Sequence, residues 1–318
     1  MLLKLNFEAL IKTKEIRKVN PWLQAIRLRT LPLAFAAIFL GSSLALYEGY
    51  FSGWVFLMAL ATAFALQILS NLANDYGDSI KGTDNDNRIG PDRAMQTGLI
   101  SKKEMLDGIV AMATIAFLCG IILLFVVSGL SIWLKLLFLA LGIAAMAAAV
   151  KYTVGENPYG YEGLGDMFVF IFFGLVAILG TVFLHQHSLT ISQILPAAAF
   201  GLISVGVLNV NNMRDTINDY ESGKITLAVR LGTKRARLYH AAVISIAILC
   251  FALYTYINYE QFYQLLWLLA IPLFGYHLFK IFTIKLYGEF DPLLKQLALS
   301  GFAISLLFGA GLIISYFF

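Results

Sequence analysis

Residues 71–84 read Asn-Leu-Ala-Asn-Asp-Tyr-Gly-Asp-Ser-Ile-Lys-Gly-Thr-Asp and lie at the end of an apolar run, 54–73. In a helix that continues through them, four polar side chains recur at i, i+3, i+4 and i+7 and share one face: Asn71, Asn74, Asp75 and Asp78. A second apolar run, 191–211, ends in a related stretch in which Asn211, Asp215 and Asp219 recur every four residues. The sequence therefore predicts two helices that carry rows of oxygen ligands where each helix leaves an apolar environment.

The composition around these stretches is that of a membrane protein. Hydrophobic residues make up 59% of the 318 residues and charged residues only 13%, with a mean hydropathy of +0.78. A soluble domain carries about 25% charged residues, whereas a helix that crosses a bilayer needs about 20 apolar residues in succession. We predict an all-α integral membrane protein with nine transmembrane helices, at 31–50, 54–73, 107–128, 131–151, 166–184, 191–211, 238–258, 262–282 and 295–317.

The distribution of charge predicts the orientation of these spans. Long polar loops follow the second, fourth, sixth and eighth spans, so these loops share one side of the membrane with the N-terminal segment 1–30. Of the 23 Lys and Arg residues, all except Lys135 lie on that side, and an excess of Lys and Arg marks the cytoplasmic side. We therefore expect a multi-pass protein of the bacterial inner membrane, with segment 1–30 cytoplasmic and a single transmembrane domain at 31–318.

The two polar stretches also suggest an internal repeat, because one ends the second span and the other ends the sixth. The simplest architecture is two parallel four-helix repeats, about 31–151 and 166–282, followed by a ninth helix at 295–317. Parallel repeats place a binding site where the two halves face each other. We therefore expect both rows of polar residues to line one site.

The residue types in the two rows favour a metal ion. Neighbouring carboxylates repel one another unless a cation lies between them, and hard oxygen donors suit Mg²⁺, which binds one or two carboxylates together with substrate phosphates. One such stretch alone is equally well explained by turn chemistry, but two in equivalent positions favour a site. The candidate metal ligands are Asn74, Asp75, Asp78, Asp84, Asn211, Asp215 and Asp219.

Basic residues follow both rows and fit a phosphorylated substrate, since Arg binds phosphate bidentately and Lys acts as a point charge. Positive-inside topology alone explains many of the other Lys and Arg residues. The candidates for binding a diphosphate are Lys81, Arg88, Arg93, Arg214 and Lys224, with Lys151 and Tyr152 from the loop 151–166 on the same side. We expect this loop to cover the site.

The two motifs, Asn74-Asp75-x-x-Asp78 and Asp215-x-x-x-Asp219, resemble those of the UbiA superfamily of intramembrane prenyltransferases. Residues 20–32, 71–93, 152–166 and 223–232 further resemble its MenA-like branch, the 1,4-dihydroxy-2-naphthoate polyprenyltransferases. The 4-hydroxybenzoate and haem O branches have an Asp eight residues after the motif Asn, where this chain has Gly82, and its next acid is Asp84. This departure favours the naphthoate branch and leaves open whether Asp84 binds metal or positions the loop.

The resemblance implies a Mg²⁺-dependent aromatic prenyltransferase of menaquinone biosynthesis. A polyprenyl diphosphate would ionise at the two rows, and 1,4-dihydroxy-2-naphthoate would accept the prenyl chain with loss of diphosphate and CO₂, giving demethylmenaquinol. The partners implied are these two substrates and the lipid bilayer, with no nucleic acid and no obligate protein partner. The catalytic residues implied are Asn74, Asp75, Asp78, Lys81, Asp215 and Asp219.

Two assignments keep alternatives. The aromatic acceptor is expected to contact Glu156, Glu162, Asp166 or Arg29, although helix N-capping explains Asp166 equally well and anchoring at the interface explains Arg29 and Arg27. The acceptor itself is alternatively homogentisate, 4-hydroxybenzoate or another aromatic compound. A different class, the secondary transporters, is less consistent with the sequence, because their acidic residues lie within the spans.

Overall fold

The computed structural model describes residues 21–85 and 89–318, and the secondary structure of these residues is entirely helical. Within them, nine helical segments are long and apolar enough to cross a membrane, as predicted: Pro21–Tyr47, Gly53–Ile80, Lys102–Val126, Ile132–Lys151, Gly165–Gln186, Ile191–Glu221, Leu227–Ile257, Phe262–Thr283 and Tyr287–Phe317. The protein is therefore a multi-pass membrane protein.

Two short elements, α2 (Pro21–Ile26) and η1 (Leu28–Thr30), precede the long helices. The first four spans are then α3 (Leu31–Tyr47), α4 (Gly53–Ile80), α5 (Lys102–Val126) and α6 (Ile132–Lys151). After η2 (Tyr159–Glu162), the fifth span is made of α7 (Gly165–Val169), the π-helical η3 (Phe170–Leu179) and α8 (Gly180–Gln186). The remaining elements are η4 (Ile191–Gln193), α9 (Ile194–Glu221), α10 (Leu227–Ile257), η5 (Phe262–Ala270), α11 (Ile271–Thr283), η6 (Tyr287–Glu289) and α12 (Phe290–Phe317).

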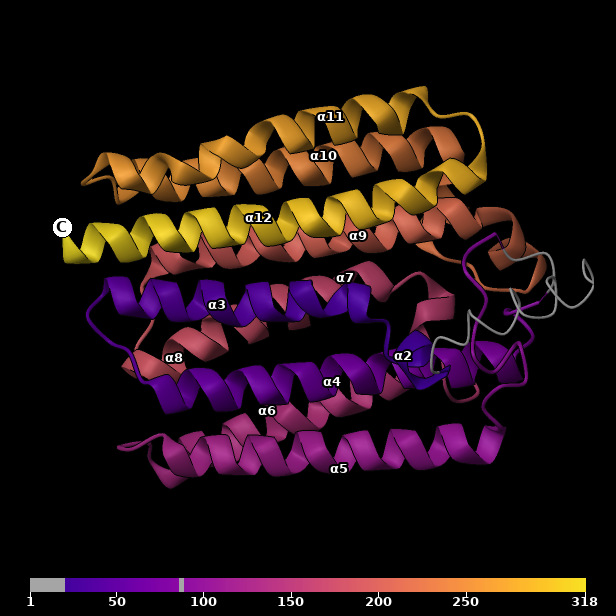
Figure 1. Cartoon of the computed structure of the whole chain (residues 1–318), viewed down its shortest axis with the longest axis horizontal. Coiled ribbons are helices and arrows are strands. Elements are labelled where there is room, and N and C mark those ends of the chain that lie inside the picture. The colour runs from indigo at the N-terminus through magenta and orange to yellow at the C-terminus, as the bar shows by residue number, and fades with distance from the viewer. Residues whose placement is uncertain (1–20, 86–88) are drawn as a thin grey trace, which may run out of the picture.

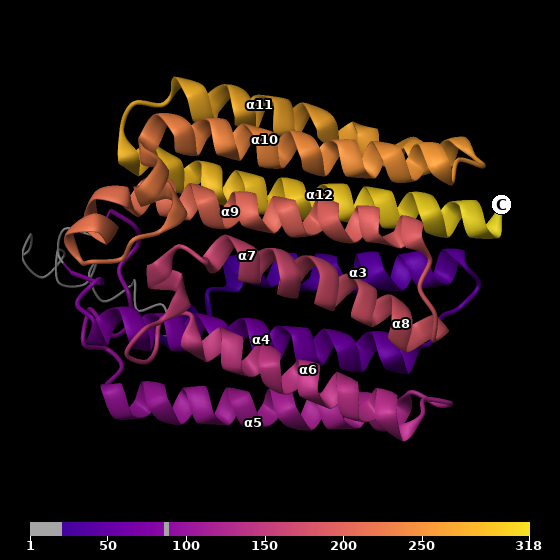
Figure 2. The same cartoon turned by 180° about the vertical axis from the view of Figure 1, so that it is seen from behind.

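The long helices run alongside one another, and the connections that follow α4, α6, α9 and α11 gather at one end (Figure 1). The C-terminus lies at the opposite end, and both views place α3, α9 and α12 in the middle, between α4, α5 and α6 on one side and α10 and α11 on the other (Figure 2). The predicted sharing of one side by the long loops is therefore confirmed. We call this side the loop face.

Several helices extend beyond the predicted spans at the loop face. The second span ends at Ile80 instead of residue 73, and the sixth ends at Glu221 instead of residue 211. Hydropathy detects only the apolar part of a helix, whereas the backbone hydrogen bonds continue through the polar residues beyond it. As a result, each polar row lies on a continuous helix.

The seventh span shows the same effect in the other direction, because α10 begins at Leu227, well before the predicted residue 238. Gly232 interrupts α10 with non-helical backbone angles, φ 70° and ψ 161°. This left-handed φ is readily adopted only by glycine. The residues before Gly232 therefore form a separate first turn that packs at the loop face.

Small residues bring the fifth span against α9. A methyl group added at Gly174 of η3 would stand 2.7 Å from the Cα of Gly201. Close approach at small residues is the usual way in which membrane helices gain packing energy, since lipid tails are as apolar as the side chains. This contact fixes the fifth span beside the helix that carries the second polar row.

The main hydrophobic core joins α3, α8, α9, α10, α11 and α12. Two smaller clusters lie mostly in the first half of the chain, and Leu184 of α8 joins one of them. The helix α6 contributes no buried residue at all. In the first half, α4 packs on α3, α5 and α6; in the second, α9 packs on η3, α10 and α12. The division into two parallel repeats stays a prediction.

Candidate active site at the loop face

The first polar row lies on the last turns of α4. Because the helix continues to Ile80, the row forms a single stripe, of which Asn71, Asn74 and Asp78 line a cavity. Thr153, from the loop after α6, donates hydrogen bonds to the carbonyl of Ala73 (3.0 Å) and to Asn74 Oδ1 (3.4 Å). The loop after α6 therefore contacts the polar row directly, and its role as a cover stays a prediction.

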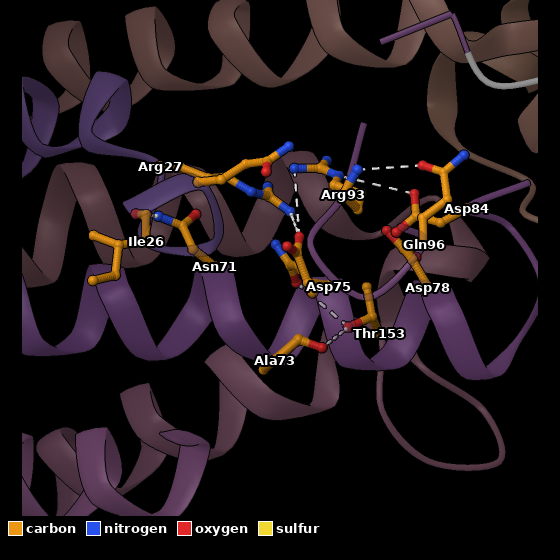
Figure 3. A network of polar contacts seen from close by, with 12 residues as sticks. Ile26, Arg27, Asn71, Ala73, Asp75, Asp78, Asp84, Arg93, Gln96 and Thr153 are labelled. Atoms are coloured by element: carbon orange, nitrogen blue, oxygen red, sulfur yellow. Dashed lines mark hydrogen bonds and ion pairs between the residues drawn. The ribbon is translucent and has the colours of Figure 1, made fainter. Parts of the chain in front are cut away.

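Asp75 lies beside this stripe and has different partners. It is 1% exposed and forms ion pairs with Arg27 and with Arg93 Nη1, the latter at 3.4 Å (Figure 3). Arg93 Nε also lies 3.9 Å from Asp84 Oδ1. Asp75 is thus enclosed by two guanidinium groups, and Asp84 approaches one of the same groups.

The backbone explains why Asp84 reaches Arg93. Gly82 follows the last residues of α4 with φ +74°, and the amides of Thr83 and Asp84 both donate to the carbonyl of Asp78, at 3.0 and 3.4 Å. Glycine at such a position is the common way to terminate a helix, because the left-handed conformation strains other residues. The glycine therefore turns the chain back towards Arg93.

The second polar row, on α9, contains a buried charge network. Arg214 is 1% exposed and donates to both carboxylate oxygens of Asp215, at 2.8 and 2.7 Å, and to Asn211 Oδ1 at 2.9 Å. Its Nη1 donates to Asp291 of α12 at 2.6 Å, and Arg29 lies 3.7 Å from the same carboxylate. Asp215, predicted as a metal ligand, is therefore neutralised by Arg214.

The two rows meet at Lys224, in the connection between α9 and α10. Its Nζ lies 3.4 Å from Asp78 Oδ1 and 4.0 Å from Asp219 Oδ1, so one ammonium group faces a carboxylate from each row. Asn218 Nδ2 also donates to the carbonyl of Thr83 at 2.8 Å. Burial acts to lower the pKa of Lys224, but the two carboxylates outweigh it and raise this pKa above its ordinary value.

Sequence reasoning assigned no role to Tyr161, which contacts the centre of the site. Its hydroxyl donates to Asp78 Oδ1 at 2.8 Å and lies 2.6 Å from Thr83 Oγ1. Burial and the neighbouring carboxylate raise the pKa of Tyr161, so it remains a hydrogen-bond donor. The sequence placed Tyr161 in the loop 151–166, on the same side as the two polar rows. No spacing rule connects that loop with Asp78, so the contact could not be predicted.

The remaining predicted residues lie in several places. Lys81 is over the ring of Tyr161, 5.3 Å from its centroid, and donates to the carbonyl of Glu156 at 3.3 Å. The side chains of Glu156, Glu162 and Lys151 are exposed and do not line the cavity, whereas Tyr152 and Arg29 do. Arg88 lies outside the described residues.

Asp166 does not cap its helix. The N-cap residue of α7 is Leu164, and Asp166 accepts a hydrogen bond from Tyr239 of α10 at 2.8 Å. The N-capping interpretation is therefore wrong, since Asp166 lies in the first turn and its side chain reaches a neighbouring helix. Asp166 does not line the cavity.

The cavity has a volume of about 410 Å³ and a polar end at the loop face. The polar end includes Arg27, Arg93, Asn211 and Lys224, together with the stripe on α4. The rest is apolar, and it runs between α3, α4, α5, α6, η3, α8 and α9. A site of this shape suits an amphiphilic ligand with an anionic head and a hydrocarbon tail.

A divalent metal is compatible with the donors at the polar end. Asp78 and Asp219 already share one cation, Lys224, and the buried Asn218 Oδ1 has no hydrogen-bond partner. Among the described residues, no three His, Cys, Asp or Glu side chains are grouped closely enough to hold a metal without other donors. A metal here would need Asn oxygens and ligand oxygens as well, which is the usual mode of Mg²⁺.

Comparison with known proteins agrees with this geometry. Residues 33–289 match the model of the UbiA prenyltransferase family. The chain is 42% identical over 300 residues to the 1,4-dihydroxy-2-naphthoate octaprenyltransferase of Haemophilus influenzae, covering 93% of this chain and 97% of that protein. It is 46% identical over 261 residues to the Escherichia coli protein of the same name, covering 82% and 84%.

A solved structure has the same fold. The UbiA homolog from Archaeoglobus fulgidus bound to GPP and Mg²⁺ superposes with a TM-score of 0.59 and 15% identity, covering 90% of this chain and 99% of the other. The family match covers most of this chain, and the two relatives exceed 40% identity over most of their length. The chain therefore belongs to the UbiA prenyltransferase family.

Proposed function

We propose that this protein transfers a polyprenyl group from polyprenyl diphosphate to 1,4-dihydroxy-2-naphthoate, with release of diphosphate and CO₂, to give demethylmenaquinol. The observation that carries the proposal is the cavity at the loop face, where two acidic helix ends meet at Lys224 and an apolar channel leads away from them. The names of the two relatives supply the acceptor, since both are 1,4-dihydroxy-2-naphthoate octaprenyltransferases.

The diphosphate and its Mg²⁺ ions are assigned to the polar end of the cavity. The Archaeoglobus fulgidus homolog was solved with GPP and Mg²⁺, and the donors in this chain suit the same ion. The residues best placed to hold the metal are Asn74, Asp78 and Asp219. Asn211 and Asp215 join them if Arg214 turns towards the diphosphate. Lys224, which lines the cavity, and Lys81, which lies over the ring of Tyr161, are assigned to the diphosphate oxygens.

When bound, Mg²⁺ would neutralise charge on the departing diphosphate, which is the main electrostatic demand of this reaction. The chain's own groups would assist. Lys224 offers its ammonium group between Asp78 and Asp219, and Tyr161 holds Asp78 in place through its hydroxyl. The covering loop, packed on α4 through Thr153, would limit access of water to the reacting carbon.

The prenyl chain is assigned to the apolar part of the cavity, which includes Gly142, Ala145, Phe172 and Val176. The allylic C–O bond breaks and the electron pair leaves with the diphosphate. The naphthoate ring then forms the new C–C bond, and its carboxyl group leaves as CO₂, returning its electron pair to the ring. Aromatic faces that line the cavity, such as that of Phe172, stabilise the allylic cation.

The loop face is assigned to the cytoplasm and the membrane to the bacterial inner membrane. Every Lys and Arg of the sequence except Lys135 falls on that side of the predicted spans, as the positive-inside rule requires. Both substrates would then meet at the cytoplasmic boundary, with the donor's tail in the bilayer.

The test is an assay with membranes that contain the protein, Mg²⁺, radiolabelled polyprenyl diphosphate and dihydroxynaphthoate. We expect a labelled prenylated product, diphosphate and CO₂ in equal amounts, and no product after chelation of Mg²⁺. If no product forms and no diphosphate is released, the proposed prenyl transfer is refuted and the transporter class is favoured. Equimolar homogentisate and 4-hydroxybenzoate should not reduce the yield; if either is prenylated in preference, the acceptor assignment is wrong.

A further inference from the structure

The carboxylate of Asp75 is occupied by two basic side chains. Its carboxylate is 1% exposed and is shared by two guanidinium groups, those of Arg27 and Arg93 (Figure 3). Asp75 does not line the cavity, whereas Arg27 and Arg93 both do. The two arginines therefore separate this carboxylate from the substrate space.

The backbone of Arg27 is held in an unusual conformation that directs it to Asp75. Arg27 has φ 54° and ψ 63°, which is left-handed and rarely adopted by residues other than glycine. Asn71 Nδ2 fixes the flanking residues by donating to the carbonyl of Ile26 (2.8 Å) and to Thr30 Oγ1 (3.0 Å). Strained residues persist where their surroundings over-determine them, and such sites are often functional.

Arg93 reaches the same carboxylate from a different part of the chain, the connection between α4 and α5. It is 7% exposed, and it lies close to both Asp75 and Asp84. Two arginines that come from segments far apart in the sequence thus meet at one edge of the cavity, where both pair with Asp75. The Nε of Arg27 is buried and has no hydrogen-bond partner.

We propose that Asp75 is a positioning residue that holds Arg27 and Arg93 as a paired site for an oxyanion of a substrate, and that it is not a metal ligand. The oxyanion is either an oxygen of the diphosphate or the carboxylate of the aromatic acceptor, since guanidinium groups bind both in the same way. This inference rests on the proposed function. The inference gives Asp75 a different role from Asp78, which lies one turn further along α4 and contacts Lys224 and Tyr161.

Kinetics of Asp75→Asn beside Asp78→Asn test the assignment. For Asp75→Asn we expect the Mg²⁺ concentration that gives half-maximal rate to be unchanged. The KM for one anionic substrate should rise about tenfold or more, because misplaced arginines make weaker charged hydrogen bonds to that substrate. A rise in the KM for the diphosphate identifies that substrate as the ligand, and a rise for the naphthoate identifies the acceptor. Asp78→Asn should instead raise the Mg²⁺ requirement.

A coupling experiment distinguishes positioning from a general structural effect. In a background that carries Arg27→Gln and Arg93→Gln, the further change Asp75→Asn should alter the same KM by less than about twofold, since residues that act through one another are not additive. The charge-matched control is Arg235→Gln, on the exposed surface of α10, which should leave both KM values as in the wild type.

Three results would overturn the inference: an increased Mg²⁺ requirement in Asp75→Asn, additivity in the double-arginine background, or unchanged KM values for both substrates. If Asp75→Asn does not fold, the variant Arg93→Gln decides by itself. It should raise the KM for one anionic substrate, and wild-type KM values for both substrates would refute the paired arginine site. Inactivity of the wild-type protein itself would refute the proposed function instead, so the two failures are distinguishable.

Discussion

The side chains around Asp78 show how much of this site is built from partners rather than from the motif alone. Asp78 shares Lys224 with Asp219 and accepts the hydroxyl of Tyr161. The contacts of Asp78 with Lys224 and with Tyr161 join segments that are distant in the sequence. Removing the charge of one carboxylate therefore changes both the proposed metal site and the ammonium group that bridges it.

We expect Asp78→Asn and Asp219→Asn each to lower kcat by about 100-fold or more, the usual cost of removing a group that stabilises transition-state charge. Initial rates at saturating substrates and Mg²⁺ measure the effect, with the amount of folded protein checked by size-exclusion chromatography. The control is Asp107→Asn, because Asp107 is exposed on α5 and does not line the cavity. A kcat near that of the wild type in either active-site variant would contradict the assignment.

At the scale of helices and loops, the end of α4 depends on the close packing of the covering loop. A methyl group added at Gly77 would lie 2.5 Å from Thr153 Oγ1 and 2.7 Å from its carbonyl carbon. At Gly82, by contrast, nothing lies within 4 Å of an added methyl group, although φ is +74°. The two glycines of one motif are therefore required for different reasons.

We expect Gly77→Ala to destabilise the protein by about 1–3 kcal/mol, the usual cost of overpacking, and to remove most activity because Thr153 must move away from Asn74. Gly82→Ala should cost only about 1–2 kcal/mol of backbone strain and keep most activity. Thermal unfolding in detergent and specific activity measure the pair. Equal activity of the two variants would show that the contact between the loop and α4 is not needed.

The apolar part of the cavity leads to a second prediction at the scale of helices, which concerns α6. An added side chain at Gly142 meets nothing within 4 Å, and Gly142 lines the cavity. We expect Gly142→Trp to raise the KM for a long polyprenyl diphosphate about tenfold, because a few methylene groups of the prenyl chain lose their apolar contacts. The KM for geranyl diphosphate should be unchanged.

The matched control for this variant is Gly275→Trp on α11, where an added side chain also meets nothing within 4 Å and which does not line the cavity. It should affect neither donor. If Gly142→Trp leaves the KM of the long donor as in the wild type, the prenyl chain does not occupy this part of the cavity.

For the whole molecule, the number of spans and the grouping of long loops were predictable because they depend on hydropathy and charge, which act over whole segments. The ends of α4 and α9 were not, because polar residues continue a helix without contributing to hydropathy. The proximity of Asp78 and Asp219 follows from the spans, whereas the pairing of Asp75 with Arg27 and Arg93 does not. It depends on a left-handed residue and on a loop, and neither has a periodic pattern.

The orientation proposed for the whole molecule can be measured by cysteine labelling after Cys119 and Cys250 are replaced by Ser. A cysteine at Lys103, on the loop face, should react with an impermeant maleimide only in inverted vesicles, and one at Ser188 only in intact spheroplasts. Both positions are exposed, so accessibility depends on the side of the membrane alone. The opposite labelling pattern would place the loop face outside the cytoplasm.

The buried Arg214 has a consequence for the synthesis of the protein. Its carboxylate partners are Asp215 on its own helix and Asp291 on α12, which is translated after α9, α10 and α11. Until α12 is inserted, the nascent chain carries a guanidinium group with only part of its counter-charge at the membrane boundary. The Arg214 network is therefore complete only after α12, which lies well beyond α9 in the sequence, has been translated and packed.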